Sequence, residues 1–320
     1  MPPLPTLAEI EAITAEIDGA VPPTPAHSWP LLNGRAGAEL WVKHENHTAI
    51  GSFKIRGALH YVTRLLAREP TTRGIIAATR GNFGQAVAFA ARRHRLAAAI
   101  VVPRENSVEK NRAMRALGAE LIEHGEDFQA AFEHSVRVAA ERGLHAMPSY
   151  HHDLVLGIAV SALAFLRQAP PLDCVYVPIG LGSGICAMMA ARDALRLPTR
   201  IIGVASAAAP AIARSFAARR LLTHPTTTRI ADGMACSTPH AEALGHILAG
   251  VERIVTVTDD EVEAAIRTYL SDTHNVAEGA AAAALAAVLQ KRERLAGSRV
   301  GVVLTGANID SLVLARILGG

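Results

Sequence analysis

The stretch Cys174-Val175-Tyr176-Val177-Pro178-Ile179-Gly180-Leu181-Gly182-Ser183-Gly184-Ile185 joins an apolar run, a glycine-rich turn and the start of a helical pattern. The run from Cys174 to Val177 is continuous in apolar character, which is typical of a strand buried on both faces of a sheet. Three glycines at alternate positions let a ligand approach the backbone, and a helix that begins there favours an anion. The stretch therefore predicts a strand–turn–helix unit that binds a phosphate group, a feature that nucleotide sites share.

Working outward, four further apolar runs have the same character. They are Gly74–Ala78, Ala98–Val102, Arg200–Val204 and Val300–Leu304. Longer amphipathic segments lie between the runs, and these include Gln85–His94, Glu109–Leu117, Phe128–Arg142 and Asp259–Leu270. Alternation of strands and helices over this length predicts an α/β fold with mainly parallel sheets.

The composition narrows the class of protein. With 320 residues, half of them apolar and 19% charged, one large or two closely packed domains are expected and wholesale disorder is excluded. The net charge of +3 is dispersed and aromatic residues make up 4%, so a nucleic-acid surface is not indicated. No apolar stretch reaches the ~18–20 residues that cross a bilayer, and the three cysteines lack paired spacing. We expect a cytoplasmic protein.

A lysine segment is the first candidate for chemistry. In Gly51-Ser52-Phe53-Lys54-Ile55-Arg56-Gly57-Ala58 the lysine lies between apolar residues where a helical pattern begins. Partial desolvation would lower its pKa and give a nucleophilic amine that can form an imine with an aldehyde. On local chemistry alone, an ordinary surface lysine at a helix start is the more common case.

Two polar turns follow strands. Thr79-Arg80-Gly81-Asn82-Phe83-Gly84-Gln85 leads into a helix, whose free N–H groups suit a carboxylate, although a simple strand-to-helix turn is equally consistent. Leu304-Thr305-Gly306-Ala307-Asn308 ends the last apolar run, and Thr305 there could face a ligand at the carboxyl edge of a sheet or cap a helix.

Taken together, in this order and spacing, these segments resemble the fold-type II pyridoxal-phosphate enzymes, the group that contains threonine dehydratase and serine racemase. The lysine motif of that group, G-S-F-K-x-R-G-A, matches Gly51–Ala58 at every fixed position. The resemblance spans nearly the whole chain, and its further matching stretches are Lys43–Glu45, Thr79–Gln85, Gly180–Gly184, Ile230–Gly233, Glu278–Ala280 and Thr305–Asn308.

The resemblance implies a fold like that of the tryptophan synthase β chain, with two three-layer α/β domains and the cofactor between them. Residues 1–73 and 149–320 would form a large pyridoxal-phosphate-binding domain, and residues 74–148 a small mobile one. Closure of the small domain over a substrate would exclude water. A homodimer or homotetramer is also implied.

The resemblance assigns roles to individual residues. Lys54 would carry pyridoxal phosphate as an imine and then act as the base at the substrate's α-carbon. The other expected cofactor contacts are Phe53 and Asn82 at the ring, Thr305 at the pyridine nitrogen, Glu278 near the ring, and Gly180, Leu181, Gly182, Ser183 and Gly184 at the phosphate. The expected substrate contacts are Ser52, Thr79, Arg80, Gly81, Asn82 and Phe83. Glu278 could equally be a helix-start carboxylate.

The implied activity is that of a carbon–oxygen lyase that turns β-hydroxy α-amino acids into 2-keto acids and ammonia. A neutral hydroxyl at Thr305 makes the cofactor ring a weaker electron sink than a carboxylate would, which favours prompt loss of a β-leaving group. The alternatives are an amino-acid racemase or a β-replacement enzyme, a non-catalytic cofactor carrier, and a nucleotide-binding protein. The last is disfavoured because the glycine turn lacks the G-x-G-x-x-G spacing.

Two residues depart from the pattern of the group. Arg80 stands where racemase-like members have a serine, and because arginine stays protonated it is a poor second base for racemisation. It could instead bind a substrate carboxylate or a polar β-substituent, or point into solvent. Phe83 replaces the usual histidine, which makes a bulky substrate such as threo-3-phenylserine plausible.

No metal site is expected. The stretch Val204–Ala211, which matches a cation site of racemase-like members, has no carboxylate, and alanine side chains cannot ligate a hard cation. The pairs His44/His47 and His151/His152 lack a third ligand and are interpreted as loop or core histidines. A C-terminal regulatory domain of the kind found on biosynthetic threonine dehydratases is not expected either.

Overall fold

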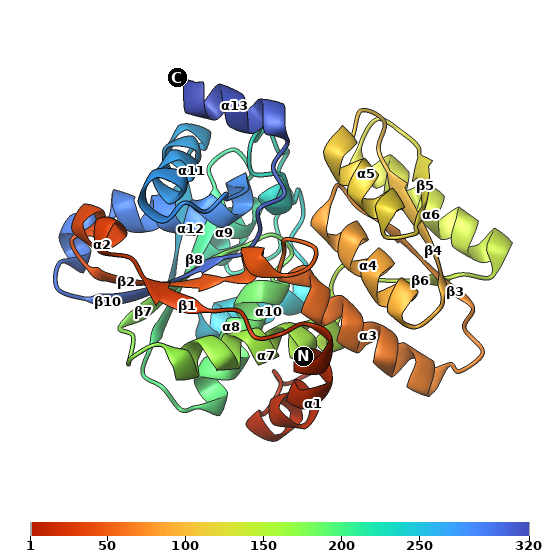
Figure 1. Ribbon diagram of the computed structural model, residues 1–320, viewed down its shortest axis with the longest axis horizontal. Coiled ribbons are helices and arrows are strands. Elements are labelled where there is room, and N and C mark those ends of the chain that lie inside the picture. The colour runs from red at the N-terminus through yellow and green to blue at the C-terminus, as the bar shows by residue number, and fades with distance from the viewer. Residues whose placement is uncertain (1, 320) are drawn as a thin grey trace.

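The computed structural model describes residues 2–319 and contains two sheets, each between layers of helices (Figure 1). The six-stranded sheet has the order β1-β2-β10-β7-β8-β9, with β1 antiparallel and all other pairs parallel. The four-stranded sheet has the order β5-β4-β3-β6 and is parallel throughout. The predicted α/β class with mainly parallel sheets is confirmed.

The strands are β1 (Ala26–Ser28), β2 (Glu39–His44), β3 (Gly74–Ala78), β4 (Ala97–Val102), β5 (Glu120–Glu123), β6 (His145–Ala146), β7 (Cys174–Pro178), β8 (Arg200–Ser206), β9 (Arg253–Val257) and β10 (Arg299–Leu304). The α-helices are α1 (Leu7–Ala20), α2 (Pro30–Ala36), α3 (Lys54–Arg68), α4 (Asn82–Arg93), α5 (Val108–Ala116), α6 (Phe128–Arg142), α7 (His152–Gln168), α8 (Ser183–Ala194), α9 (Ala211–Ala218), α10 (Ala241–Gly250), α11 (Asp259–Thr273), α12 (Gly279–Gln290) and α13 (Ser311–Gly319). Short 3₁₀ helices are η1 (Glu45–His47), η2 (Asp232–Met234) and η3 (Arg292–Leu295).

The six-stranded sheet is buried on both faces, which explains its continuous apolar strands. Because side chains alternate along a strand, Val175 and Val177 of β7 join the core with α7, α8 and α10, while Cys174 and Tyr176 join the core with α2, α11 and α12. Figure 1 shows these helices as separate layers on either side of the strands. The alanine run of α12 is fully within the second core, so it is a closely packed helix, as its sequence indicates.

The four-stranded sheet is sandwiched in the same way. Ile75 and Ala77 of β3 pack with α4 in the core that also contains α7, whereas Ile76 packs with α6 in a small separate core. Helix α3 lies between the two sheets and its apolar face belongs to the shared core (Figure 1). The two halves of the molecule are therefore joined through one continuous apolar core.

The helix ends follow the sequence signals. Thr258 and Glu261 form a reciprocal capping box at the start of α11, next to the predicted carboxylates. Gly143 ends α6 in the left-handed conformation, with a φ of 63°, and Gly118 has a φ of 92° just beyond α5.

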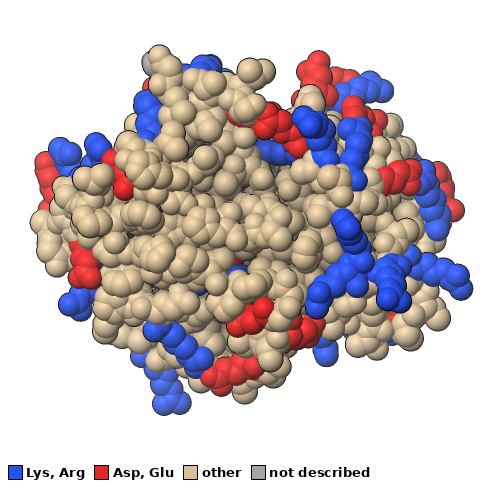
Figure 2. Space-filling view, in the orientation of Figure 1, with Lys and Arg blue, Asp and Glu red and all other residues tan. Residues whose placement is uncertain are grey.

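Charged side chains are unevenly placed on the face shown in Figure 2. The middle of that face is largely free of charge, whereas both lysine or arginine and aspartate or glutamate gather over the part that carries the four-stranded sheet. Among residues 2–319, none of the helices combines the length and the apolar character needed to cross a membrane.

Candidate functional site

The predicted segments meet where β3, β7 and β10 end. Because β7 and β10 are parallel neighbours, the turns that follow them leave one edge of the large sheet together. The lysine segment is anchored to the second of these turns. Phe53 N–H donates to the Thr305 carbonyl at 3.0 Å, Ala307 N–H donates to the Gly51 carbonyl at 2.9 Å, and Ser52 forms an isolated bridge with Gly306.

The amine of Lys54 lies at the start of α3 and reaches the glycine turn. Its Nζ donates a hydrogen bond to Ser183 Oγ at 3.1 Å, although the two residues are 129 positions apart. The ring of Phe53 lies beside it, with its centroid 4.9 Å from Nζ. Burial lowers the pKa of the Lys54 amine to about 8, against the attraction of the nearby Glu278 carboxylate. The amine is thus closer to its nucleophilic, neutral form than an ordinary lysine is.

The glycine turn after β7 has the geometry that an anion requires. Helix α8 begins after Gly182, which has a φ of 106°, and no side chain caps the first N–H groups. A Cβ on Gly180 would lie 2.4 Å from the Gly233 carbonyl oxygen, and one on Gly182 would lie 2.7 Å from Ala243 Cβ. A nucleophilic amine 3.1 Å from the first residue of an uncapped helix therefore suits a ligand that carries both an aldehyde and a phosphate, as pyridoxal phosphate does.

A pH profile tests this description of the amine. Near pH 7.5 an amine with a pKa of about 8 is roughly one quarter neutral, whereas an ordinary lysine is only about 0.1% neutral. The rate at which cofactor-free protein reacts with pyridoxal phosphate should therefore rise with pH and level off above about pH 9. Stopped-flow absorbance measures this rate, and a rate that keeps rising tenfold per pH unit up to about pH 10 would show an unperturbed amine.

A second cluster lies beside the lysine turn. Asn82 Nδ2 donates to Glu278 Oε1 at 2.7 Å, and Asn308 Nδ2 donates to Asn82 Oδ1, also at 2.7 Å. The Glu278 N–H donates to the Gly306 carbonyl, so the carboxylate is held against the turn after β10. Burial raises the pKa of Glu278 to about 7, while the charge of Lys110 and the Asn82 hydrogen bond oppose that rise. A Cβ on Gly306 would come within 2.6 Å of Glu278 Oε1, so this contact requires glycine.

The turn after β3 leads into a helix that has no side-chain cap. Thr79 is buried, and its Oγ1 accepts the N–H of Gly81 at 3.0 Å. Helix α4 follows directly, and no side-chain oxygen satisfies its first N–H groups. Arg80 is exposed and makes no hydrogen bond or ion pair within residues 2–319. Phe83 is half-buried and packs against the shared core.

Most of the predicted residues are thus brought together. Contacts link the lysine turn, the glycine turn and the Asn82 cluster. Arg80 is exposed, Phe83 packs partly into the core, and Leu181 is half-buried within the glycine turn.

Sequence reasoning missed four residues around the site. Lys110 Nζ forms an ion pair with Asp232 Oδ2 at 2.5 Å. Cys236 Sγ lies 3.9 Å from the position of a Cβ on Gly180, and burial raises its pKa to about 11, so the thiol is uncharged. Asn308 belonged to a matched motif but carried no predicted role. Asp232 was likewise only part of a familiar stretch, and no local pattern marked Lys110 or Cys236.

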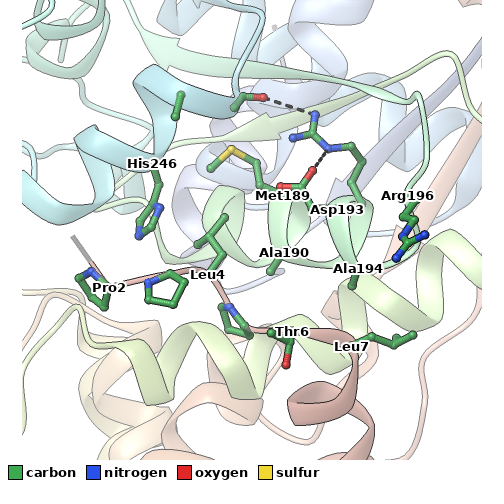
Figure 3. Close-up of a pocket in the computed structure, with 15 residues that line it drawn as sticks. Pro2, Leu4, Thr6, Leu7, Met189, Ala190, Asp193, Ala194, Arg196 and His246 are labelled. Atoms are coloured by element: carbon green, nitrogen blue, oxygen red, sulfur yellow. Dashed lines mark hydrogen bonds and ion pairs between the residues drawn. The ribbon is translucent and has the colours of Figure 1, made fainter.

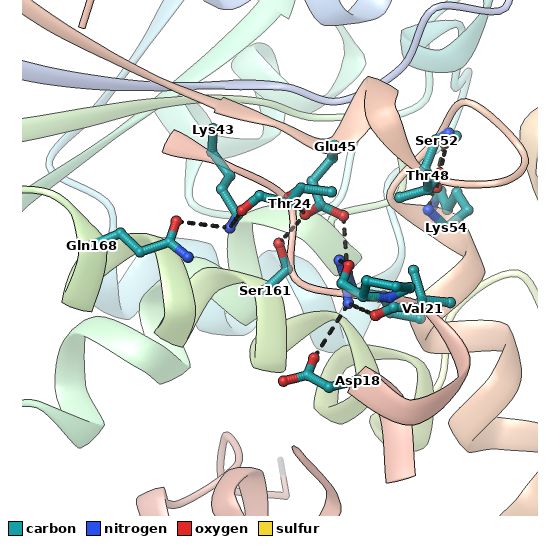
Figure 4. Close-up of polar contacts among 12 residues, drawn as sticks. Asp18, Val21, Thr24, Lys43, Glu45, Thr48, Ser52, Lys54, Ser161 and Gln168 are labelled. Carbon is teal, nitrogen blue, oxygen red and sulfur yellow. Dashed lines mark hydrogen bonds and ion pairs between the residues drawn. The ribbon is translucent and has the colours of Figure 1, made fainter. Parts of the chain in front are cut away.

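A buried ionic network joins Glu45 to α3 and α7 close to the lysine segment (Figure 4). Glu45, directly after β2, accepts hydrogen bonds from Arg56 Nε at 3.0 Å, from Thr24 Oγ1 at 2.6 Å and from Ser161. Arg56 is only two residues beyond Lys54 on α3 and is 1% exposed. Separating Arg56 from Glu45 would leave a buried charge without a partner, which is energetically costly. The ion pair therefore holds the first turn of α3, and with it Lys54, in place.

The cavity drawn in Figure 3 is a different place. It measures about 770 Å³ and is lined by the segment Pro2–Leu7 and by residues near the ends of α8 and α10, such as Arg192 and His246. None of the predicted site residues lines it. The chemistry is therefore assigned from the converging side chains and not from the hollow in Figure 3.

His44 and His47, which were considered as metal ligands, contact other side chains. His44 is buried, accepts a hydrogen bond from Trp29 Nε1 at 3.1 Å and stacks on His47. Within residues 2–319 no three or more histidine, cysteine, aspartate or glutamate side chains are grouped so that they could hold a metal ion. That the Val204–Ala211 stretch binds no cation stays a prediction.

Comparison with known proteins agrees with this geometry. The family model described as "Pyridoxal-phosphate dependent enzyme" matches residues 17–306. The L-threo-3-hydroxyaspartate ammonia-lyase of Saccharomyces cerevisiae is 30% identical over 99% of this chain and 97% of its own length. The phenylserine dehydratase of Ralstonia pickettii is 34% identical, with 99% and 97% covered. A crystal structure of a pyridoxal 5′-phosphate-dependent aspartate racemase superposes with a TM-score of 0.92 at 27% identity, covering 98% of this chain and 99% of that one.

Proposed function

Because the chain belongs to the family of pyridoxal-phosphate dependent enzymes, we propose that it converts β-hydroxy α-amino acids to 2-keto acids and ammonia. The β-carbon loses its hydroxyl and the α-carbon its proton, and hydrolysis of the resulting enamine gives a 2-keto acid and ammonium. The observation that carries this proposal is the buried Lys54 amine, whose Nζ lies 3.1 Å from Ser183 Oγ at the start of an uncapped helix. The similarity of the chain to two proteins named as an ammonia-lyase and a dehydratase also supports the proposal.

The cofactor supplies an electron sink that makes the α-proton of an attached amino acid acidic. The chain's own residues do the rest. Ser183 and the N-terminus of α8 would hold the phosphate, and Phe53, whose ring lies beside the Lys54 amine, would pack against the cofactor ring. Lys54, once its amine is released, takes the α-proton, for which its lowered pKa is well suited. Thr305, a neutral residue at the end of β10, leaves the sink weak, which favours rapid loss of the β-hydroxyl.

The N-terminus of α4 binds the substrate carboxylate in this proposal. Its free N–H groups follow Gly81, next to the cluster that Asn82 forms with Glu278. The part of the chain from residue 74 to residue 148 carries this turn together with the four-stranded sheet, and we propose that it moves as a small domain over the substrate. Closure would exclude water from the reacting carbon atoms.

A product assay tests the function directly. Purified protein with pyridoxal phosphate should convert serine, threonine or threo-3-phenylserine to keto acid and ammonia in equal amounts. Recovery of an amino acid inverted at its α-carbon, or of a β-substituted amino acid when a thiol is added, would instead indicate a racemase or a β-replacement enzyme. We expect any racemisation to be slow, because Arg80 cannot act as the second base.

The substrate's side chain is the subject of a separate prediction. Phe83 adds an apolar ring beside the α4 N-terminus, and aromatic pairs contribute about 0.5–1.5 kcal/mol beyond burial. We expect kcat/KM to be higher for threo-3-phenylserine than for threonine, and Phe83→His to reduce that ratio by about 2- to 10-fold. Steady-state kinetics on both substrates measures the ratio. A clear preference of the unaltered protein for threonine would refute this assignment.

A further inference from the structure

The ammonium group of Lys110 lies at the mouth of the site and has no role in the proposed reaction so far. The chain has only four lysines, Lys43, Lys54, Lys110 and Lys291, among 32 lysines and arginines in all. The side chain of Lys110 is 11% exposed, although it begins on α5, at the edge of the four-stranded half. Because a positive charge this far from solvent requires a partner of opposite charge, the surroundings of the ammonium show which anions it can bind.

Lys110 is in contact with the turn that binds the carboxylate. A Cβ on Gly81 would lie 2.7 Å from Lys110 Cδ and 3.6 Å from Nζ, so the lysine side chain covers the glycine directly. The first N–H groups of α4, which no side chain caps, follow the same glycine. One ammonium and one helix N-terminus therefore lie next to the same glycine, and both attract an anion.

Asp232, which pairs with Lys110 in this structure, can be replaced by another carboxylate. Asp232 accepts its hydrogen bond at 2.5 Å, yet the Asp232 side chain is 40% exposed and can be hydrated when released. Asp232 Oδ1 also accepts the N–H of Gly233, which keeps the carboxylate on η2. Burial of the Lys110 amine is outweighed by Asp232 and Glu278, which hold its pKa above the usual value, so it is positively charged.

We propose that Lys110 is a substrate-binding residue that pairs with the α-carboxylate of the amino acid, and that Asp232 neutralises its ammonium when no substrate is bound. This inference rests on the proposed function, because it takes an amino acid as the ligand. A substrate carboxylate at Gly81 receives the lysine and the α4 N–H groups together, whereas Asp232, on η2, is held by a different hydrogen bond. Substrate binding thus replaces the ion pair between Lys110 and Asp232 by one between Lys110 and the substrate carboxylate, which also accepts hydrogen bonds from the α4 N–H groups.

Two ligands that differ only in the carboxylate test the proposal on the protein with bound pyridoxal phosphate. Alanine and ethylamine share the amine that exchanges with Lys54, and neither has a β-leaving group. Their dissociation constants follow from the change in cofactor absorbance on titration. A charge-assisted hydrogen bond contributes about 1.5–3 kcal/mol, so Lys110→Met should weaken alanine binding by about 10- to 100-fold and leave ethylamine binding unchanged.

Two further variants separate binding from a structural role. Lys110→Arg keeps the charge and should recover most of the lost alanine affinity, which also shows that the site is intact. Asp232→Asn removes the competing carboxylate and should leave alanine binding unchanged or tighter. If Lys110 and Asp232 only lock the two halves together, both neutralising variants should weaken alanine binding equally, and that result would overturn the proposal.

The remaining outcomes are also decisive. Equal losses for alanine and ethylamine in Lys110→Met, or no loss for alanine, would contradict a carboxylate contact. These titrations require amine exchange but no elimination, so they are independent of the product assay. A protein that binds alanine through Lys110 yet releases no keto acid would contradict the dehydratase and uphold this contact.

Discussion

Replacing Lys54 by alanine is expected to lower the rate of keto acid formation by at least about 10⁴-fold, because both the covalent link to the cofactor and the base at the α-carbon are lost. The variant should also be colourless after it is mixed with pyridoxal phosphate and the unbound cofactor is removed by gel filtration. The substitution removes a half-buried side chain at the first position of α3, while Glu45 and Arg56 still fix the helix behind it. We therefore expect a folded but inactive protein, as measured by circular dichroism and an assay for ammonia.

Lys291→Ala is the matched control. Lys291 follows α12, at the opposite end of that helix from Glu278, and only three other lysines are present. This variant should keep its colour and its activity. Residual activity of Lys54→Ala above about one per cent of the unaltered protein would mean that another group removes the proton.

Replacing Gly182 by alanine should have the second largest effect. The residue has a φ of 106°, and a Cβ there would lie 2.7 Å from Ala243 Cβ on α10. An L-residue is strained in this conformation by about 1–2 kcal/mol, and the overlap must also be relieved by moving the turn away from α10. Since the N–H groups of this turn hold the phosphate in our proposal, cofactor affinity should fall by about 100-fold.

Gly34→Ala provides the comparison for that variant. Gly34 lies in α2, and nothing is within 4 Å of an added Cβ. Alanine there should stabilise the helix slightly and leave cofactor binding unchanged. Equilibrium titration of each cofactor-free protein with pyridoxal phosphate gives the two dissociation constants. If Gly182→Ala bound the cofactor within threefold of the unaltered protein, the turn would not be the phosphate site.

The predicted strands were the central ones, and the reason is physical. The five runs identified from the sequence correspond to β3, β4, β7, β8 and β10, which have neighbours on both sides or are covered on both faces. The edge strands β1, β5, β6 and β9 were not predicted, and neither was the interior strand β2, in which Glu39, Lys43 and His44 leave an apolar run of only three residues. Edge strands are less completely buried and mix polar with apolar residues, as Glu120–Glu123 of β5 does, so no continuous apolar run marks them.

A similar limit applies to the site. Lys54, Ser183, Asn82 and Thr305 lie in local motifs, and the resemblance to one enzyme group identified them together. The contact between Lys110 and Asp232 joins residues 122 positions apart and depends on how α5 packs against η2, which no local pattern encodes. The exposure of Arg80 and the partial burial of Phe83 also depend on packing, so their substrate roles remain proposals.

The central claim is that Lys54 holds the cofactor covalently, and borohydride reduction followed by peptide mapping tests it most directly. We predict that the yellow protein loses its colour on reduction and that the pyridoxyl-phosphate adduct appears on the peptide containing Lys54. With four lysines in the chain, the peptides of Lys43, Lys110 and Lys291 serve as internal controls. An adduct on one of those three peptides, or no adduct on any peptide, would contradict the claim.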